Sequence, residues 1–185
     1  MGSNWEGVLV AQCAPAMVGI KPSNLLVCLR EQFPDFDETV EEHARLLSRA
    51  GVEMKLLCRC ERRWLLLIYR PECLKRQLQE PETAELLRKA GYPVEEGMGA
   101  VLETLCERMQ EGFPHEIGLL LGYPAEDVVG FCENGGRNYR CCGQWKVYSD
   151  VERAKRMFAR FDRCRDELCR RVGSGIPLLR VLGVA

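Results

Sequence analysis

Runs of apolar residues predict the helices and strands in the first half of the chain. Residues 37–51 begin with two acids, carry an apolar stripe at every third or fourth position and end at a glycine, which predicts a helix. Residues 23–30 form a short apolar run that fits either a buried strand or the start of a helix. Two further runs, 52–60 and 62–70, are separated by a charged step and predict an antiparallel hairpin that ends at Pro71.

The second half of the chain is mostly helical by the same criteria. Its first three helical stretches cover residues 72–79, 81–91 and 93–112. Residues 115–122 are short and apolar enough for a buried strand, and residues 124–134 open with a proline and acids as a helix does. Residues 144–148 predict a short strand. A long final helix is expected to begin at an Asp150 cap and to carry apolar residues at heptad-like spacing.

This order of elements indicates an α+β protein. We expect a single domain over residues 1–185, with about four or five short strands in a mixed or antiparallel sheet, helices packed on the sheet and a long C-terminal helix. Neither an internal repeat nor a flexible linker divides the chain, which favours one domain.

Charge and cysteine usage narrow the class of protein. The chain has 26 Lys and Arg against 27 Asp and Glu, a net charge of -1, which argues against a nucleic-acid binder. Its apolar runs are shorter than the roughly 18–20 residues of a membrane span. The 11 cysteines are odd in number, and the N-terminal sequence does not resemble a secretory signal. Reduced thiols in a cytoplasmic protein are therefore expected.

Four phrases of the sequence resemble the signature of one bacterial family. They are CAPAMVGIKPSNL at 13–25, FPHEIGLLLGYPAEDVVGF at 113–131, GRNY at 136–139 and CGQWKVYSD at 142–150. The resemblance is to the domain-of-unknown-function 3793 family and spans nearly the whole chain. Ala16-Met17 and Gln144 depart from the family's usual residues, but neither departure removes an ionisable group. The resemblance implies a cytoplasmic, single-domain bacterial protein and brings no activity, substrate or cofactor.

The first candidate site is a thiol nucleophile. Cys13 lies in a stretch rich in Ala, Pro and Gly that we expect to be a loop, and His115 stands at the start of a predicted strand. A His base near a Cys lowers the thiol pKa and creates a nucleophile. With Asp127, or Asp150 further on, the order Cys, His, carboxylate is that of papain-like and arylamine-acetyltransferase enzymes. The alternative is a buried structural Cys and a His with a local hydrogen bond.

The second candidate is a metal or iron–sulfur site. Its ligands would come from Cys13, Cys58, Cys60, Cys132 and the Cys141-Cys142 pair, with His115 as a further candidate. The sequence contains no Cys-x-x-Cys knuckle, so we assign no metal ligands. Cys58 and Cys60 would share one face of a strand, where they could chelate or simply pack.

The third candidate is a pocket for a small anionic ligand. Its predicted residues are Lys21, Glu116, Tyr123, Arg137, Trp145, Lys146 and Tyr148, beside His115. We expect the pocket to gather the 13–21 loop, the start of the 115–121 strand and the 142–148 strand. Glycines at 130, 135 and 136 could let backbone amides approach a ligand, or could serve only a turn that needs positive φ.

These residues lead to two functional hypotheses of different classes. The preferred one is a thiol-dependent hydrolase or transferase acting on a small anionic substrate, with Cys13 as nucleophile, His115 as base and Lys21 binding the anion. The alternative is a non-enzymatic module that binds a metal, a cofactor or a redox partner. In either case the basic C-terminal helix over 150–172 could dock an acidic protein partner, or could be an ordinary solvated surface.

Overall fold

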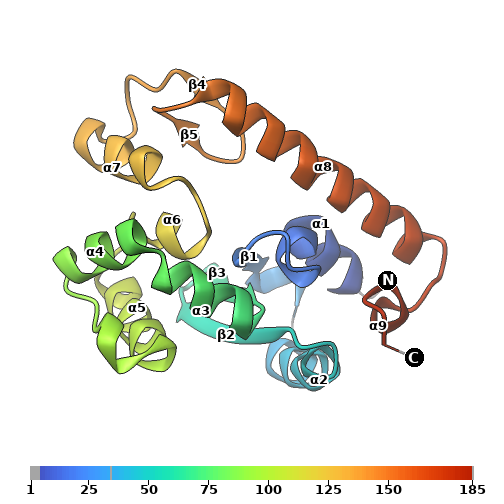
Figure 1. Ribbon diagram of the computed structural model, residues 1–185. Helices are drawn as coiled ribbons and strands as arrows, with labels where there is room; N and C mark the ends of the chain where they lie inside the picture. Colours follow the sequence, from blue (N-terminus) through green and yellow to red (C-terminus); the bar gives the residue numbers. More distant parts are fainter. Residues whose placement is uncertain (1–4, 34, 185) are drawn as a thin grey trace. The chain divides into compact units, whose positions relative to one another are not determined.

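The chain folds into helices and two antiparallel sheets, so the predicted α+β class is confirmed (Figure 1). This computed structural model describes residues 5–33 and 35–184. Contacts divide the chain into two compact units, residues 1–73 with 163–185, and residues 74–162. The single domain over residues 1–185 stays a prediction.

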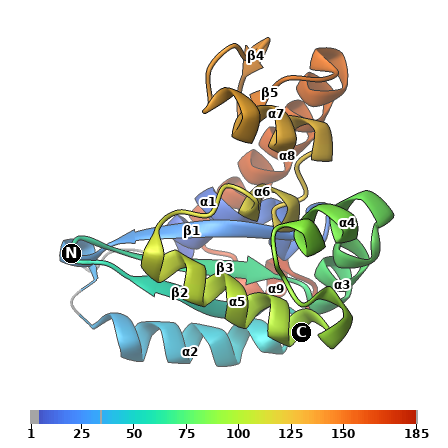
Figure 2. The same cartoon turned by 90° about the vertical axis from the view of Figure 1, so that its left-hand side faces the viewer.

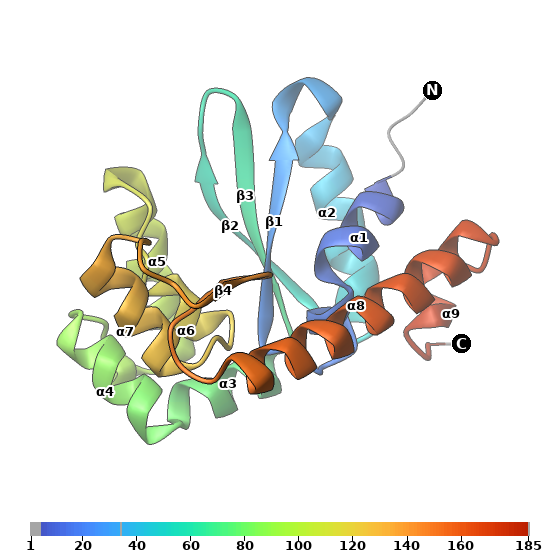
Figure 3. The same cartoon turned by 90° about the horizontal axis from the view of Figure 1, so that it is seen from above.

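A three-stranded sheet forms the centre of the first unit. Its strands are β1 (Ser23–Leu29), β2 (Glu53–Arg59) and β3 (Arg63–Tyr69), in the order β1-β3-β2 (Figures 2 and 3). Both pairings are antiparallel, and they confirm the predicted hairpin and the strand reading of residues 23–30. Strand β3 is buried from Trp64 to Tyr69, and because successive side chains of a strand point to opposite faces, both faces of this central strand are covered.

Helices of the first unit pack on one face of this sheet. They are α1 (Trp5–Met17), the 3₁₀ turn η1 (Arg30–Gln32), α2 (Phe36–Ser48), the second half of α8 (Val151–Gly173) and α9 (Leu178–Val181). One buried cluster joins them to the sheet through Leu9 of α1, Leu47 of α2, Leu168 of α8, and Leu26 and Leu66 of the strands. Leu26 and Leu66 lie directly opposite each other on the adjacent strands β1 and β3, so their side chains lie on the same face of the sheet.

Cys13 lies inside α1, so the loop expected at residues 13–21 is wrong for its first five residues. Pro15 does not stop the helix because it comes near the end, where Ile20 and Lys21 donate their backbone N–H groups to the Pro15 carbonyl. The chain then turns at Gly19, which has a φ of 79°. The turn is thus four to five residues shorter than the sequence suggested.

The second unit consists mainly of short helices. These are the end of α3 (Pro71–Gln79), α4 (Pro81–Lys89), the 3₁₀ turn η2 (Val94–Glu96), α5 (Met98–Glu111), α6 (Ile117–Leu120), α7 (Ala125–Asn134) and the first half of α8. The two-residue strands β4 (Cys141–Cys142) and β5 (Lys146–Val147) pair antiparallel beside α7. Gly97, with a φ of 92°, separates η2 from α5 and divides the helix expected over 93–112.

The predicted strand at residues 115–122 is wrong, because this segment forms the one-turn helix α6. Residues 117–121 are all buried, which is why the segment is as apolar as a core strand. Only Ile117 is β-branched, and the three leucines that follow Gly118 favour a helix over a strand. Gly118 packs against Val128 of α7, where a Cβ would come within 2.9 Å of that side chain.

The start of the long helix α8 agrees with the prediction. The Asp150 carboxylate accepts a hydrogen bond from the backbone N–H of Arg153 at 2.9 Å, which is the geometry of an N-terminal cap. In the part of the chain that the structure describes, no helix has both the length and the apolar character needed to cross a membrane.

Candidate functional site

Cys13, the predicted nucleophile, is completely buried in the core of the first unit. Burial raises the pKa of its thiol well above the ordinary value, and the charge of Lys21 lowers that pKa only in part. The thiolate is the nucleophilic form of cysteine, so a protonated and buried thiol reacts slowly. In this environment Cys13 behaves as a core side chain.

Lys21, predicted to bind an anionic group, is buried beside Cys13 with 4% of its surface exposed. Burial lowers the pKa of Lys21 to about 8, while Cys13 raises it and Arg165 lowers it. The structure therefore brings Lys21 to the predicted nucleophile, but it places the pair inside the core of the unit.

His115, the predicted base, belongs to the second unit and is exposed. Its ring lies edge-on to Phe131, with 4.9 Å between the ring centroids, and 6.1 Å from the ring of Phe113. Because Cys13 belongs to the first unit, the Cys13–His115 dyad stays a prediction.

Asp127, the predicted carboxylate partner, holds the second unit together. It is 2% exposed, and its carboxylate accepts hydrogen bonds from Trp145 Nε1 (2.7 Å), the backbone N–H groups of Tyr148 and Ser149, and Ser149 Oγ (each 2.8 Å). Burial by itself would raise the pKa of Asp127, but these four donors bring it below its ordinary value. Among the described residues, no hydrogen bond joins Asp127 to His115. The carboxylate fastens the 145–149 segment to α7.

The predicted aromatic ligand residues also serve the core of the second unit. Trp145 stacks on Tyr123, with 4.8 Å between their centroids, and meets Phe158 of α8 edge-on at 4.5 Å. Tyr148 packs so closely on Gly130 that a Cβ there would lie 2.6 Å from the tyrosine ring. These contacts show that the rings pack within the unit, and their role in binding a ligand stays a prediction.

Lys146 is the centre of a smaller surface cluster in the second unit. Its Nζ donates to the Gly136 carbonyl at 2.7 Å and lies 5.7 Å from the ring centroid of Phe131 and 5.0 Å from that of Tyr139. His115 touches the same Phe131 ring. The structure thus brings together two of the basic residues predicted for one site, but it gives Lys146 a carbonyl partner.

The other predicted ligand groups have individual roles. Glu116 forms an ion pair with Arg108 at 2.8 Å and accepts a hydrogen bond from the Tyr92 hydroxyl at 3.2 Å. Arg137 is exposed in the loop after α7. Gly135 and Gly136 have φ values of 56° and 73°, so the turn interpretation of these glycines fits the structure.

The cysteines considered for a metal site do not form one cluster. Within residues 5–33 and 35–184, no group of three or more His, Cys, Asp or Glu side chains is arranged to hold a metal ion. None of the eleven cysteines, all of which lie within the described residues, forms a disulfide. The sulfur atoms of Cys58 and Cys60 are in direct contact at 2.9 Å.

The Cys58–Cys60 contact is built by the end of the β2–β3 hairpin. Cys58 is paired with Leu65 after a register shift at Leu56, and the Cys60 N–H donates to the Arg63 carbonyl at 2.9 Å. Cys58 lies in β2, and Cys60 comes directly after the last residue of that strand, Arg59. Cys58 is buried, whereas Cys60 is half-buried.

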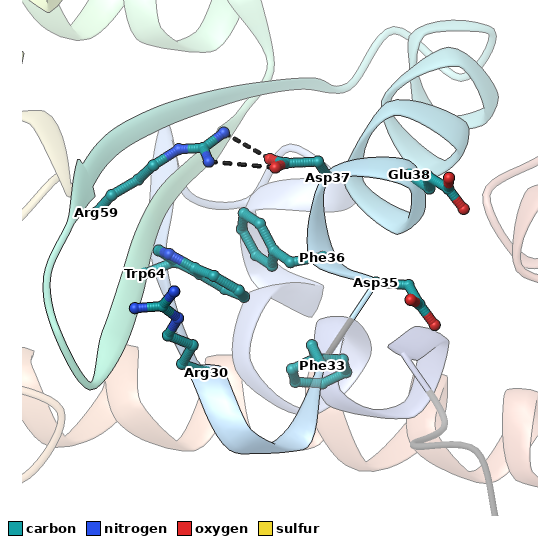
Figure 4. Close-up of a pocket in the computed structure, with 8 residues that line it drawn as sticks. All are labelled: Arg30, Phe33, Asp35, Phe36, Asp37, Glu38, Arg59 and Trp64. Atoms are coloured by element: carbon teal, nitrogen blue, oxygen red, sulfur yellow. Dashed lines mark hydrogen bonds and ion pairs between the residues drawn. The ribbon is translucent and has the colours of Figure 1, made fainter.

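A pocket of about 440 Å³ lies near the same end of the first unit (Figure 4). The residues that line it come from β3, the end of β2 and the η1–α2 region: Arg30, Phe33, Asp35, Phe36, Asp37, Glu38, Arg59 and Trp64. This pocket is not among the sites that the sequence predicts. Its only signal was an aromatic and acidic segment at the start of a helix, a pattern that also fits an ordinary helix N-terminus.

Comparison with known proteins identifies a family without adding an activity. The chain matches no curated protein and no solved structure. The family model described as "Protein of unknown function (DUF3793)" matches residues 9–182. This match covers the core helices and strands of both units, as well as the four phrases that carry the resemblance. The chain therefore belongs to the DUF3793 family.

Proposed function

We propose that the protein is a thiol–disulfide exchange module in which Cys58 and Cys60 are the reactive dithiol. The observation that supports the proposal is the 2.9 Å contact between Cys58 Sγ and Cys60 Sγ. Two thiols whose sulfur atoms are in contact can form a disulfide with a small movement. Such a module is one form of the redox-partner binding that the sequence suggested as an alternative. Its substrate is a disulfide, either of a small thiol or of a protein.

The difference in exposure assigns an order to the two cysteines. The half-buried Cys60 attacks as a thiolate on one sulfur of the partner, RS–SR, which forms a mixed disulfide and releases one RS⁻. Cys58, buried behind it, then attacks the Cys60 sulfur, so that the Cys58–Cys60 disulfide forms and the second RS⁻ leaves. The two thiol protons end on the two released thiols, and the partner gains the two electrons that the dithiol loses.

Glutathione disulfide tests this order. In the wild-type protein we expect glutathione to leave Cys60 as the internal disulfide forms, whereas in Cys58→Ser it should remain attached to Cys60. The exposed Cys132 serves as an internal control, because it has no cysteine beside it in the sequence. Mass spectrometry of the digested protein measures each adduct. A stable adduct on Cys60 in the wild-type protein would overturn the proposal.

A second candidate function retains Cys13 as the nucleophile of a hydrolase or transferase. It is favoured by one observation, the buried cation of Lys21 beside the Cys13 thiol, since a nearby cation favours the thiolate. It also requires His115 as base and access of a substrate to a side chain with no exposed surface. The alkylation experiment described in the Discussion separates the two candidates.

A further inference from the structure

Arginines gather at the end of the β2–β3 hairpin, beside the Cys58–Cys60 pair. Residues 59–63 have the sequence RCERR, and each of them apart from Cys60 is exposed. The Cys60 N–H donates to the Arg63 carbonyl at 2.9 Å, which places the backbone of this arginine directly opposite the cysteine. The charges of these arginines therefore bear on what reaches the Cys60 thiol.

Arg59 is neutralised and lies on the side of the sheet away from the thiols. Its guanidinium donates to both carboxylate oxygens of Asp37, at 3.2 Å and 2.5 Å, and Figure 4 shows it reaching across to α2. Arg59 is paired with Trp64 in the sheet, so it shares the face on which Trp64 packs against Phe36. Arg59 thus contributes no unpaired charge beside the dithiol.

Arg63 lies on the opposite face of the sheet, together with the Cys58 thiol. Leu65 is paired with Cys58 and comes two residues after Arg63 in β3, so the three side chains share one face. The contact with Cys58 Sγ brings Cys60 Sγ to the same region. Leu29 of β1 is paired with Arg63 and is 41% exposed, which places an accessible apolar surface beside the cation.

The side chains of Arg62 and Arg63 make no ion pair within residues 5–33 and 35–184. Glu61 is the acid of the same turn, and it is also without an ion pair in this part of the chain. Arg30 lies over the Trp64 ring, 5.9 Å from its centroid, and so belongs to the other face. Two cations against one acid leave an excess of positive charge beside the thiols.

We infer that the disulfide on which the dithiol acts is that of a small anionic thiol, held by Arg62 and Arg63. This inference rests on the proposed thiol–disulfide exchange. Guanidinium groups bind carboxylate, sulfonate or phosphate groups through charge-assisted hydrogen bonds, and unpaired cations raise the local concentration of an anionic substrate. Because both arginines lie within three residues of Cys60, the anionic group must lie within a few bonds of the sulfur that Cys60 attacks.

Three disulfides that share one carbon skeleton test the sign of the charge. Bis(2-sulfonatoethyl) disulfide is anionic, bis(2-hydroxyethyl) disulfide is neutral and cystamine is cationic. With each of them, the Cys60 thiolate attacks one sulfur and releases one thiolate, and Cys58 releases the second thiolate as the internal disulfide forms. Acid quenching, alkylation and peptide mapping of the full chain measure the rate at which the Cys58–Cys60 disulfide appears. Comparing variant with wild type for each compound cancels the intrinsic reactivity of that compound.

Removing the cations should slow only the anionic compound. At low ionic strength, Arg62→Gln and Arg63→Gln should each slow bis(2-sulfonatoethyl) disulfide by about threefold, leave bis(2-hydroxyethyl) disulfide unchanged and speed the reaction of cystamine. Arg63→Lys keeps the charge and should retain the wild-type rates. Glu61→Gln should have the opposite effect and speed the anionic compound, because it removes the acid of the turn.

Arg49→Gln is the matched control, since it removes an exposed cation from the same unit. Arg49 caps the C-terminal end of α2, roughly 18 Å along the helix from Asp37, so this variant should leave all three rates unchanged. Equal slowing by Arg49→Gln and Arg63→Gln would overturn the inference. Exchange with all three compounds that ignores Arg62→Gln and Arg63→Gln would also overturn it, but would leave the dithiol proposal standing. Failure of all three to form the Cys58–Cys60 disulfide would overturn both.

Discussion

Two regions that are rich in polar side chains use them in opposite ways. In the second unit, the residues around Asp127 are bonded to one another, and one carboxylate accepts four hydrogen bonds. At the hairpin end of the first unit, two thiols touch, and Arg30 faces a pocket without an ionic partner among the described residues. The difference shows that a stretch of sequence with many polar side chains can encode a packed core. Groups available for chemistry or binding are those that the fold leaves accessible.

The largest expected effect concerns the Asp127 carboxylate. Asp127→Asn should lower the free energy of unfolding by about 3 kcal/mol. The asparagine side chain would place its own N–H donors against groups that now donate hydrogen bonds to the carboxylate. Asp37→Asn is the matched change at the hairpin end. Its carboxylate pairs with an exposed Arg59, so it should cost less than about 1 kcal/mol. Chemical denaturation of both variants measures the difference.

Acid should reduce the effect of Asp127→Asn. The folded-state pKa of Asp127 is below its ordinary value of 3.8, so its stabilisation is present above that value and is lost as the pH falls through the folded pKa. The two proteins should therefore approach each other in stability at low pH. Equal costs for Asp127→Asn and Asp37→Asn at pH 7 would contradict the comparison between the two regions.

The next largest effect is the difference in reactivity between two cysteines of the first unit. In the native protein at pH 7, iodoacetamide should modify the half-buried Cys60 at least about a hundredfold faster than Cys13. Burial makes the Cys13 side chain inaccessible to the reagent and raises the pKa of its thiol. Peptide mapping after timed quenching measures both rates.

His115→Ala shows which of the two candidate functions holds. If Cys13 is a core side chain, this substitution leaves its slow alkylation unchanged. A tenfold slowing of Cys13 alkylation in His115→Ala would instead show that the two residues form a dyad, because the loss of one unit of pKa depression removes about nine-tenths of the thiolate. That result would identify Cys13 of α1, rather than Cys60 at the hairpin end, as the reactive thiol.

A smaller effect is expected from buried Lys21. Its pKa is about 8 in the folded protein and 10.5 ordinarily, so the unfolded chain binds more protons between these values. The free energy of unfolding should therefore rise with pH, by about 1 kcal/mol between pH 8 and pH 9 for this group. Lys21→Met should remove that increment, and comparing the two proteins at each pH cancels the other groups. If both proteins showed the same pH profile, Lys21 would be hydrated rather than buried.

The sequence predicted elements with strong local signals. The acids, apolar stripe and glycine around α2 and the Asp150 cap of α8 are local features, and they located the start of each helix within one residue and the end of α2 within three. The hairpin of β2 and β3 was equally clear, because two β-rich runs flank a charged step. The prediction failed for α6, since four buried apolar residues in a row are compatible with a strand or a helix.

The sites were harder to predict because they depend on contacts between distant segments. Asp127 was selected as a catalytic carboxylate, but its four donors are 18–22 residues away and cannot be identified from spacing. Cys13 was placed in a loop because of Pro15 and Gly19, whereas the helix continues through the proline. The sequence placed Cys58 and Cys60 on one face of a strand, whereas β2 ends at Arg59, and the contact of their sulfur atoms was not predicted.

The most direct test of the reactive dithiol uses Arg59, which stands between the two cysteines. Trypsin cleaves after Lys55, Arg59 and Arg62, so Cys58 and Cys60 fall in separate peptides, 56–59 and 60–62. After treatment with one equivalent of glutathione disulfide and alkylation of the remaining thiols, the two peptides should be recovered joined, and reduction should separate them. Recovery of both as separate alkylated peptides, with the disulfide at other cysteines, would contradict the proposal that the hairpin end is the redox site.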